Sequence, residues 1–270
     1  MRDSTVLKKL RSGEVANCLK ANIGDAQATE IAAMAGFDCL WIDREHLAQD
    51  WSVLNSQVWA AKAHNVDVMV RVPRGSYSGY IKPLEMDATG ILVPHIMSLE
   101  DAKQVVKWTR FHPLGLRPID GGSADGAYTR MDFGEYLKRS NEQRFVVLQI
   151  EDPEPLKDLG AIAALEGYDM LFFGPGDFSQ SIGAPGDWKN PKLIEARKLV
   201  AKAANDHGKF AATSGSIDSL EEFIDMGYKF VNIGADIVGL GNYCDSLISR
   251  FNNSTTRKKL NQDAAPGKPY

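Results

Sequence analysis

The chain has 270 residues, of which 44% are hydrophobic and 24% are charged, a composition typical of a globular protein. The formal net charge is −4 and the two signs are mixed along the chain, so the sequence lacks the basic patch of a nucleic-acid-binding protein and favours a small-molecule partner. A polar N-terminus and the absence of about 18 consecutive apolar residues argue against a signal peptide and a membrane span. The cysteines, Cys18, Cys39 and Cys244, have no paired spacing, which favours reduced thiols and a cytoplasmic location.

Short apolar runs alternate with amphipathic stretches along the chain. The predicted strands are 16–20, 39–43, 67–71, 90–94, 144–150, 170–174, 209–212 and 230–234, and the predicted helices include 26–35, 52–63, 99–109, 154–165, 191–206 and 219–226. Strict alternation of strands and helices is the signature of a parallel sheet, and eight such units favour closure into a barrel. No G-x-G-x-x-G follows the first strand, which argues against a Rossmann fold. We therefore expect an α/β protein with one domain, a (β/α)8 TIM barrel over residues 1–251, followed by a flexible tail at 252–270.

Turn and cap residues support this division. Asp152-Pro153 has the pattern of a helix N-cap, which would leave the preceding Glu151 free for another role. Asn190-Pro191 repeats the pattern, and glycines at 36, 167, 208 and 227 stand where helices are expected to end. The region 111–143 is long for a loop, and its small polar stretch at 120–128 is a candidate for shaping a substrate pocket.

Two acids each follow a strongly apolar strand. Glu151 comes after 145–150, and Asp177 comes shortly after 170–173. Catalytic groups in a barrel of this kind stand at the carboxyl ends of several strands, so both acids are expected in one pocket. Unpaired like charges there would repel, which makes a metal site plausible, with Mg²⁺ or Mn²⁺ favoured and Co²⁺ or Zn²⁺ as possible substitutes. Gly174 and Gly176 would let the backbone approach a ligand closely.

Other strand ends add candidates for proton transfer and anion binding. His46 is the leading general acid or base, because histidine titrates near neutrality, and His95 is a weaker candidate. Arg71 ends a buried strand and is expected to face an anion. Lys20 leaves a Schiff-base mechanism open as an alternative, although the sequence around it is not especially apolar.

Five motifs in chain order resemble those of the HpcH/HpaI aldolases, which are metal-dependent class II pyruvate aldolases of the phosphoenolpyruvate/pyruvate barrel superfamily. The motifs are IDREH at 42–46, VRVP at 70–73, GILVP at 90–94, LQIE at 148–151 and FGPGD at 173–177. The resemblance runs from about residue 13 to residue 250. Arg44, Asp87 and Gly176 depart from the usual pattern, which has glycine at the first two positions and alanine at the third.

The resemblance implies a role for each matching residue. Glu151 and Asp177 would bind the divalent metal, with Gln149 beside it, and the amides of Gly176 and Asp177 would hold the carboxylate of pyruvate. Arg71 would stabilise the enolate and the aldehyde oxygen. His46, with a carboxylate at Glu85 where the family usually has aspartate, would orient a water that acts as the base. The resemblance also implies a homo-oligomer, a hexamer, in which this acid acts across a subunit boundary.

The expected activity is the reversible cleavage of a 4-hydroxy-2-oxo acid to pyruvate or hydroxypyruvate and an aldehyde. The expected partners are therefore a small 2-oxo acid and an aldehyde, without nucleic acid or membrane. One alternative keeps the same enolate site but makes the protein a metal-dependent 2-oxo-acid decarboxylase or another lyase. Two others are a Schiff-base aldolase that uses Lys20 and a non-catalytic barrel that binds a metabolite.

Overall fold

The computed structural model describes residues 1–254 and residue 258. Within them, parallel strands close into a barrel in chain order, with β8 pairing back to β1. The strands are β1 (Ala16–Ala21), β2 (Cys39–Asp43), β3 (Asp67–Arg71), β4 (Gly90–Val93), β5 (Phe145–Ile150), β6 (Met170–Phe173), β7 (Phe210–Ser214) and β8 (Tyr228–Ala235). The predicted barrel and every predicted strand are thus confirmed, with small differences at the strand ends.

Alternating side chains along the strands build two separate cores. One face of each strand points outward against the helices, and the other fills the barrel, where Phe145, Phe172 and Phe230 pack together with smaller apolar side chains. Helix α1 (Thr5–Arg11) contributes Leu7 and Leu10 to this inner core. It therefore covers the amino ends of the strands, and the opposite end is left for chemistry.

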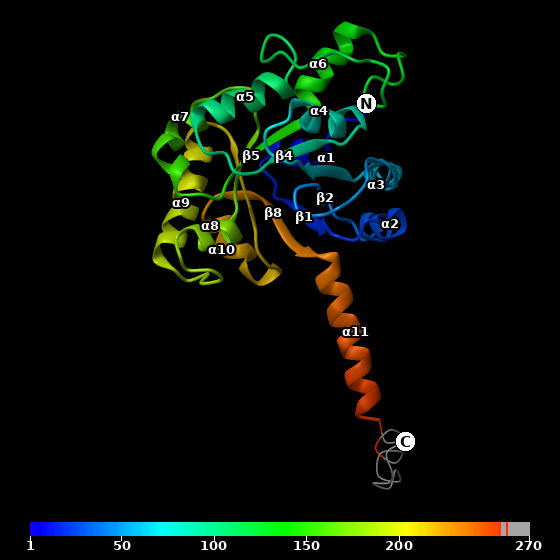
Figure 1. The fold of residues 1–270 in the computed structure, drawn as a ribbon, viewed down its shortest axis with the longest axis vertical. Coiled ribbons are helices and arrows are strands. Elements are labelled where there is room, and N and C mark those ends of the chain that lie inside the picture. The colour runs from blue at the N-terminus through cyan, green and yellow to red at the C-terminus, as the bar shows by residue number, and fades with distance from the viewer. Residues whose placement is uncertain (255–257, 259–270) are drawn as a thin grey trace.

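The predicted helices surround the barrel (Figure 1). They are α2 (Ala26–Met34), α3 (Trp51–Ala63), α5 (Leu99–Thr109), α7 (Leu159–Ala164), α9 (Pro191–Asp206) and α10 (Leu220–Asp225), with short 3-10 turns η1 (Glu154–Asp158) and η2 (Ile217–Ser219) before α7 and α10. Asn190 caps α9 by accepting a hydrogen bond from the Lys192 N–H at 3.1 Å. The four glycines predicted at helix ends all have positive φ angles, between 67° and 94°. The predicted N-cap of α9 and the predicted helix ends at these glycines are confirmed.

Further helices occur where the sequence pattern was not read as helical. They are α4 (Tyr77–Glu85), α6 (Phe133–Gln143), α8 (Pro175–Ser181) and α11 (Asp236–Asn252). Helix α6 shortens the predicted loop at 111–143, because its last eleven residues are helical. Among the described residues, none of the helices has both the length and the apolar character that crossing a membrane would require.

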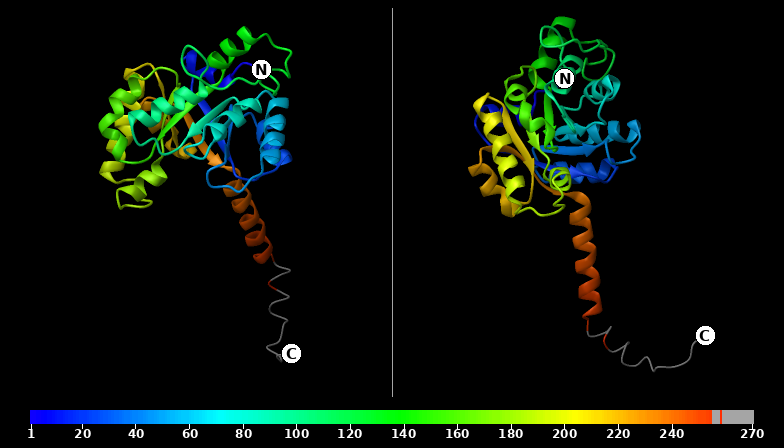
Figure 2. Two further views of the ribbon diagram at one scale, coloured as in Figure 1. Left: turned by 45° about the horizontal axis from the view of Figure 1, so that its top comes forward. Right: turned by 60° about the vertical axis from the view of Figure 1, so that its left-hand side comes forward.

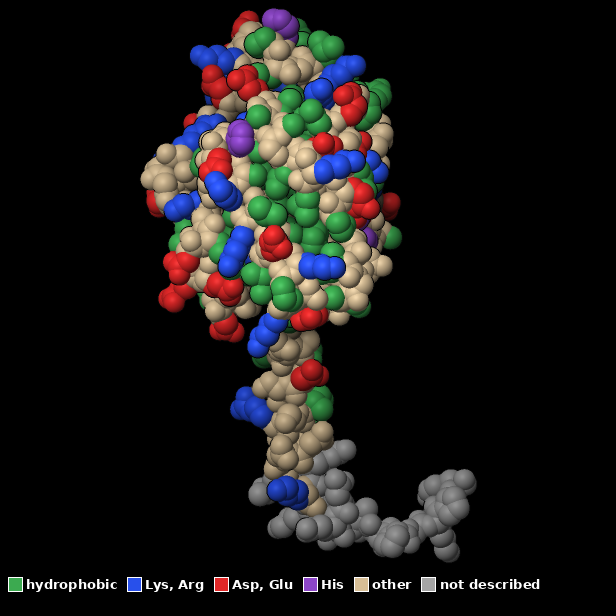
Figure 3. Space-filling view, turned by 90° about the vertical axis from the view of Figure 1, so that its left-hand side faces the viewer, with side chains coloured by type: hydrophobic (Ala, Val, Ile, Leu, Met, Phe, Trp, Pro, Cys, Tyr) green, Lys and Arg blue, Asp and Glu red, His purple; other side chains and the backbone are tan. Residues whose placement is uncertain are grey.

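Helix α11 projects away from the barrel instead of folding back along it (Figure 1), and the other views show the same stalk (Figure 2). None of its residues is buried. Its exposed apolar side chains include Ile237, Leu240, Tyr243, Leu247 and Ile248, and Figure 3 shows the stalk from a third side. The helix reaches Asn252, the first residue of the predicted tail, and the remainder of that tail lies outside the described residues apart from 253, 254 and 258.

Candidate active site

The carboxyl ends of β2, β3 and β5 bring several of the predicted site residues together. Asp43 and Arg71 end neighbouring strands in register. Gln149 is the last residue but one of β5, two positions before Glu151. All four are buried. The strand ends that the sequence indicated therefore do form one polar cluster at the mouth of the barrel.

Glu151 is almost fully buried, with 1% of it exposed. Its Oε2 accepts a hydrogen bond from Gln149 Nε2, and its Oε1 accepts one from the His95 backbone N–H at 2.9 Å. Burial is the main cause that raises the pKa of Glu151 to about 8; the nearby charge of Asp177 acts in the same direction, and His95 and Arg71 act against it. A carboxylate that is costly to ionise beside a second acid is what a bound cation would stabilise.

Asp177 lies in the first turn of α8, directly after β6. Gly174 precedes the helix, and a Cβ at this glycine would lie only 2.6 Å from Glu151 Oε2. Among the described residues, no group of three or more His, Cys, Asp or Glu side chains is placed to hold a metal ion. Two acids that supply only two protein ligands fit a cation that keeps water or substrate oxygens as its other ligands, as Mg²⁺ does.

Arg71 is held rigidly from two sides. Its Nη2 and Nε both contact Asp43, the latter at 3.1 Å, and its Nε lies 3.2 Å from Glu45 Oε2. Burial would lower the pKa of Arg71, but Asp43 and Glu45 raise it above its ordinary value. The same Asp43 contacts Lys20 Nζ at 2.9 Å, so the Lys20 amine is engaged in an ion pair. This arrangement presents Arg71 as a fixed cation and does not favour Lys20 as a free nucleophile.

Two histidines lie at the mouth. His46 is exposed, and its Nε2 lies 3.5 Å from Glu45 Oε2. His95 belongs to the cluster around Glu151, because its ring nitrogen Nδ1 is 2.8 Å from Asp152 and 3.7 Å from Glu151 Oε1. Burial lowers the pKa of His95, but the hydrogen bond to Asp152 and the charge of Glu151 raise it overall.

The backbone of His95 has a φ of +49°, a conformation that residues other than glycine seldom adopt. In this conformation the backbone N–H of His95 donates its hydrogen bond to Glu151. No sequence pattern predicts the positive φ. The predicted cap at Asp152 is wrong: η1 has no side-chain cap bond, and Asp152 contacts the His95 ring instead. Asp152 therefore faces His95 at the mouth of the barrel and does not cap a helix.

Glu85 does not join this cluster. It is the last residue of α4, and helices of a parallel barrel run back toward the amino ends of the strands. The backbone of the polar stretch at 120–128 lies beside it, because the Asp125 N–H donates to the Glu85 carbonyl at 3.3 Å. A buried ion pair between Arg117 and Asp125, at 2.8 Å, fixes this stretch. Glu85 and the stretch at 120–128 thus lie apart from the Arg71–Glu151 cluster, along a groove that they share with Trp51 and Asn55 of α3.

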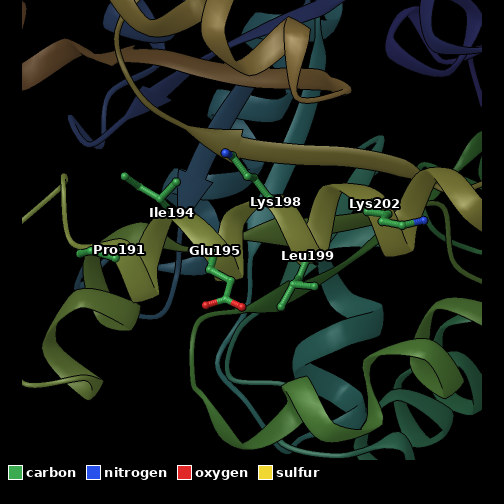
Figure 4. A pocket seen from close by; sticks show the side chains of 6 residues that line it. All are labelled: Pro191, Ile194, Glu195, Lys198, Leu199 and Lys202. Carbon is green, nitrogen blue, oxygen red and sulfur yellow. The ribbon is translucent and has the colours of Figure 1, made fainter.

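A shallow groove on the surface is a poorer candidate. It runs along the outer face of α9 and is lined by Pro191, Ile194, Glu195, Lys198, Leu199 and Lys202. Figure 4 shows that these side chains fan out from a single helix, with Lys198 pointing away from Glu195 and Leu199. The groove contains none of the groups gathered at the strand ends and offers no converging polar set.

Comparisons with known proteins agree with the geometry. The family model described as HpcH/HpaI aldolase/citrate lyase matches residues 21–242. The chain is 32% identical over 246 residues to a hydroxypyruvate/pyruvate aldolase of Pseudomonas aeruginosa, covering 90% of this chain and 91% of that protein. It is 32% identical over 233 residues to a 4-hydroxy-2-oxovalerate aldolase of Rhodococcus jostii, covering 85% and 88%.

A solved structure supports the same assignment. A HpcH/HpaI aldolase/citrate lyase family protein from Burkholderia cenocepacia superposes with a TM-score of 0.86 at 28% identity, over 93% of this chain and all of that one. The prediction of an aldehyde-lyase of the pyruvate-aldolase type is confirmed by these relatives. The chain belongs to the HpcH/HpaI aldolase/citrate lyase family.

Proposed function

We propose that the protein cleaves a 4-hydroxy-2-oxo acid reversibly into pyruvate or hydroxypyruvate and an aldehyde, at a divalent metal held by Glu151 and Asp177. The observation that carries this proposal is the pair of acids after β5 and β6, in which the charge of Asp177 acts on the buried Glu151 and Gly174 packs directly against the Glu151 carboxylate. The names of the two relatives indicate substrates of this class, which supports the same class of substrate for this protein.

The choice of metal follows from the donor atoms. Two carboxylates and no sulfur or imidazole at the pair itself suit a hard cation, so we propose Mg²⁺ or Mn²⁺, with Co²⁺ or Zn²⁺ as substitutes. Gln149 would lie beside the metal, and the first-turn amides of Gly176 and Asp177 would hold the carboxylate of the 2-oxo acid. When bound, the metal would supply positive charge for the enolate oxygen that forms as the C3–C4 bond breaks.

Two side chains at the mouth of the barrel would carry out proton transfer and stabilise the oxygen anion. His46, directly or through a water, would take the proton of the C4 hydroxyl, because its ring is exposed to the mouth. Arg71 would donate its N–H groups to the developing oxygen anion, and Asp43 keeps it in place for that purpose. Both roles require groups fixed before substrate arrives, which the buried Asp43–Arg71 pair supports.

We further propose that the protein works as a homo-oligomer, a hexamer by family resemblance, in a cytoplasmic compartment that keeps its free cysteines reduced. Glu85 supports this, because an acid at the amino end of its own barrel could assist His46 only from another copy. The exposed apolar side chains of α11 also favour burial against a second chain.

The test measures exchange of the C3 protons of pyruvate with solvent in the presence of Mg²⁺ or Mn²⁺, and again after EDTA. We expect exchange that depends on the metal, followed by carbon–carbon bond formation when an aldehyde is added. If EDTA leaves the rate of proton exchange unchanged, or if no exchange occurs with any metal, the mechanism is wrong. Exchange without aldehyde-dependent bond formation would instead favour a decarboxylase or another lyase at the same site.

A further inference from the structure

A cavity of about 330 Å³ lies outside the barrel, between helices α4 and α5. The two helices pack against each other (Figure 1). Unlike the groove on α9, this cavity has walls from several elements, which are the loop after β3, helix α4, the end of β4 and helix α5. Its volume is in the range of small-molecule sites, and none of its lining residues belongs to the Arg71–Glu151 cluster.

The inner part of the cavity is apolar. Val93, Ile96 and Val105 line it and belong to the buried core between the strands and the helices. Tyr80 and Trp108 complete the walls, with their ring centroids 5.8 Å apart and their planes tilted by 54°. Aliphatic and aromatic walls of this kind bind the apolar part of a ligand. We therefore expect a bound molecule to have an apolar part.

The rim of the cavity carries one positive and one negative charge. Arg74 Nη2 and Asp101 Oδ2 form an ion pair at 2.6 Å, and 45% and 33% of the two side chains are exposed. Both groups have hydrogen-bonding capacity left. Within the described part of the chain, Asp101 Oδ2 also accepts the Met97 N–H at 3.0 Å, whereas Oδ1 has no partner, and Arg74 donates only through Nη2. A ligand can therefore contact both charges without breaking the pair.

The two charged side chains are attached to backbone that is fixed before a ligand arrives. Gly75, directly after Arg74, donates its N–H to the Tyr80 hydroxyl at 2.9 Å and has a φ of +99°, which favours glycine. Asp101 lies in the first turn of α5 and is held by the Met97 N–H. Groups that are already in place lose less conformational entropy when a ligand binds, which favours affinity.

The adjacent opposite charges restrict what can bind at the rim. A ligand with a single charge would be attracted by one of the two groups and repelled by the other, because Arg74 and Asp101 are in contact. A zwitterion is attracted by both, with its carboxylate at Arg74 and its ammonium group at Asp101. An α-amino acid has these two groups and a side chain on the same carbon atom.

We propose that this cavity, which we call the α4–α5 pocket, binds a free α-amino acid with an apolar side chain. The carboxylate accepts hydrogen bonds from Arg74, and the ammonium group donates to Asp101 Oδ1. The apolar side chain packs against Val93, Ile96 and Val105. Because the α4–α5 pocket is separate from the site of the proposed aldol reaction, binding of the amino acid does not depend on that function.

Ile96 connects the α4–α5 pocket to the candidate active site. Its side chain lines the pocket, and its backbone N–H donates to the Gln149 carbonyl at 3.2 Å. The preceding residue, His95, donates its N–H to Glu151. An amino acid that packs against Ile96 would stabilise this segment in the conformation that holds Gln149 and Glu151, and so strengthen metal binding. This coupling rests on the proposed metal site, and by linkage the metal would strengthen amino-acid binding by the same factor.

The experiment measures binding of L-leucine and L-phenylalanine to the full chain by calorimetry, first without metal. Two further probes each lack one charge of leucine: 4-methylpentanoate has no ammonium group, and isopentylamine has no carboxylate. We expect leucine to bind at least about tenfold more tightly than either of these, because each loses a charged hydrogen bond. If neither amino acid binds, or if 4-methylpentanoate binds as tightly as leucine, the α4–α5 pocket is not an amino-acid site.

The variants Arg74→Gln and Asp101→Asn should each weaken leucine binding by about tenfold or more. Both side chains are partly exposed, so the fold should be retained. Glu100→Gln is the matched control, because Glu100 precedes Asp101 in the first turn of α5 but does not line the pocket. It should bind leucine as tightly as the unmodified protein does. Equal affinities in all four proteins would mean that leucine binds elsewhere and that the assigned site is wrong.

The coupling is tested by repeating the leucine titration with saturating Mg²⁺ or Mn²⁺. We expect the metal to strengthen leucine binding by about fivefold or more. The same leucine affinity with and without bound metal would overturn the coupling through Ile96 and leave the α4–α5 pocket standing. If the protein binds no metal at all, the proposed function fails, whereas leucine binding without metal still decides whether the α4–α5 pocket is an amino-acid site.

Discussion

Burying the ionised form of an acid such as Glu151 costs free energy unless a positive charge compensates it. Its pKa of about 8 reflects mainly burial, and the charge of Asp177 adds to the cost of ionising it. Because the raised pKa favours the neutral form in the folded state, the metal-free protein should lose stability as the pH rises from about 4.5 toward 8. A bound cation would remove this loss, so the site and the stability of the fold are linked.

The variants Glu151→Gln and His46→Ala should separate metal binding from proton transfer. Glu151→Gln should lose metal and activity together, whereas His46→Ala should keep metal but lose most turnover, by about 10²- to 10⁴-fold. Metal content by mass spectrometry and aldol turnover check both. Equal loss of metal in the two variants would show that the assigned roles are wrong.

Removing Asp43 should be costly because it leaves the buried Arg71 without its main partner. Asp43→Ala should destabilise the fold by about 3–5 kcal/mol and reduce turnover, as measured by urea unfolding and steady-state kinetics. Lys20→Met is the control, since Lys20 is partly exposed and contacts the same carboxylate. It should keep metal-dependent turnover; complete loss, with borohydride trapping at Lys20 in the unmodified protein, would support the Schiff-base alternative.

The residue-scale predictions depended on strand ends, and the position of a side chain could be predicted where alternation and burial fix its direction. Arg71, Gln149 and Glu151 follow directly from the ends of β3 and β5. The contacts of His95 could not be predicted, because they depend on a left-handed backbone and on Asp152, which no local pattern reveals.

At the scale of elements, α11 stands apart from the rest of the fold. The Asp236 carboxylate accepts the backbone N–H groups of Asn22 and Ile23, at 2.8 and 3.0 Å, and so fixes the start of the helix to the loop after β1. Beyond that anchor, Leu240 and Leu247 are separated by seven residues and lie on the same face of the helix. An apolar stripe of this kind is expected to be covered in the assembled protein.

A charge placed in that stripe should therefore weaken self-association. Leu247→Glu should lower the molar mass measured by light scattering, because a buried charge at an interface is not compensated. Ser249→Glu adds the same charge on the opposite face of α11 and should leave the mass unchanged. The same mass for all three proteins would mean that α11 does not contribute to the assembly.

Element prediction worked for strands better than for helices. Runs such as 145–150 are uniformly apolar and admit one interpretation inside an alternating series. Helix α4 was missed because Pro83 interrupts its pattern, and α8 because its sequence begins with Gly174-Pro175-Gly176, which resembles a turn. For α11 the periodic stripe was present, but two glycines at 239 and 241 obscured it.

At the scale of the whole molecule, the position of Glu85 makes a clear prediction about assembly. If this acid assists His46 of another copy, an oligomer that mixes Glu85→Gln and His46→Ala chains will contain some complete sites. Dissociating and reassociating the two inactive variants together should restore part of the activity that neither has alone. Mixtures that remain inactive although native mass spectrometry shows mixed oligomers would argue against a shared site.

The barrel has one open end. Leu7 and Leu10 of α1 pack into the inner core beneath the strands, and Phe145, Phe172 and Phe230 fill the interior above them. Substrate and both products must then pass through the same mouth. In the proposed reaction the 2-oxo acid is held at Glu151, which is buried, so it would be the deeper fragment. We expect the 2-oxo acid to leave last, so that it inhibits cleavage competitively while the aldehyde inhibits noncompetitively, as product-inhibition kinetics can show. The order of product release would thus be decided by a helix at the opposite end of the barrel.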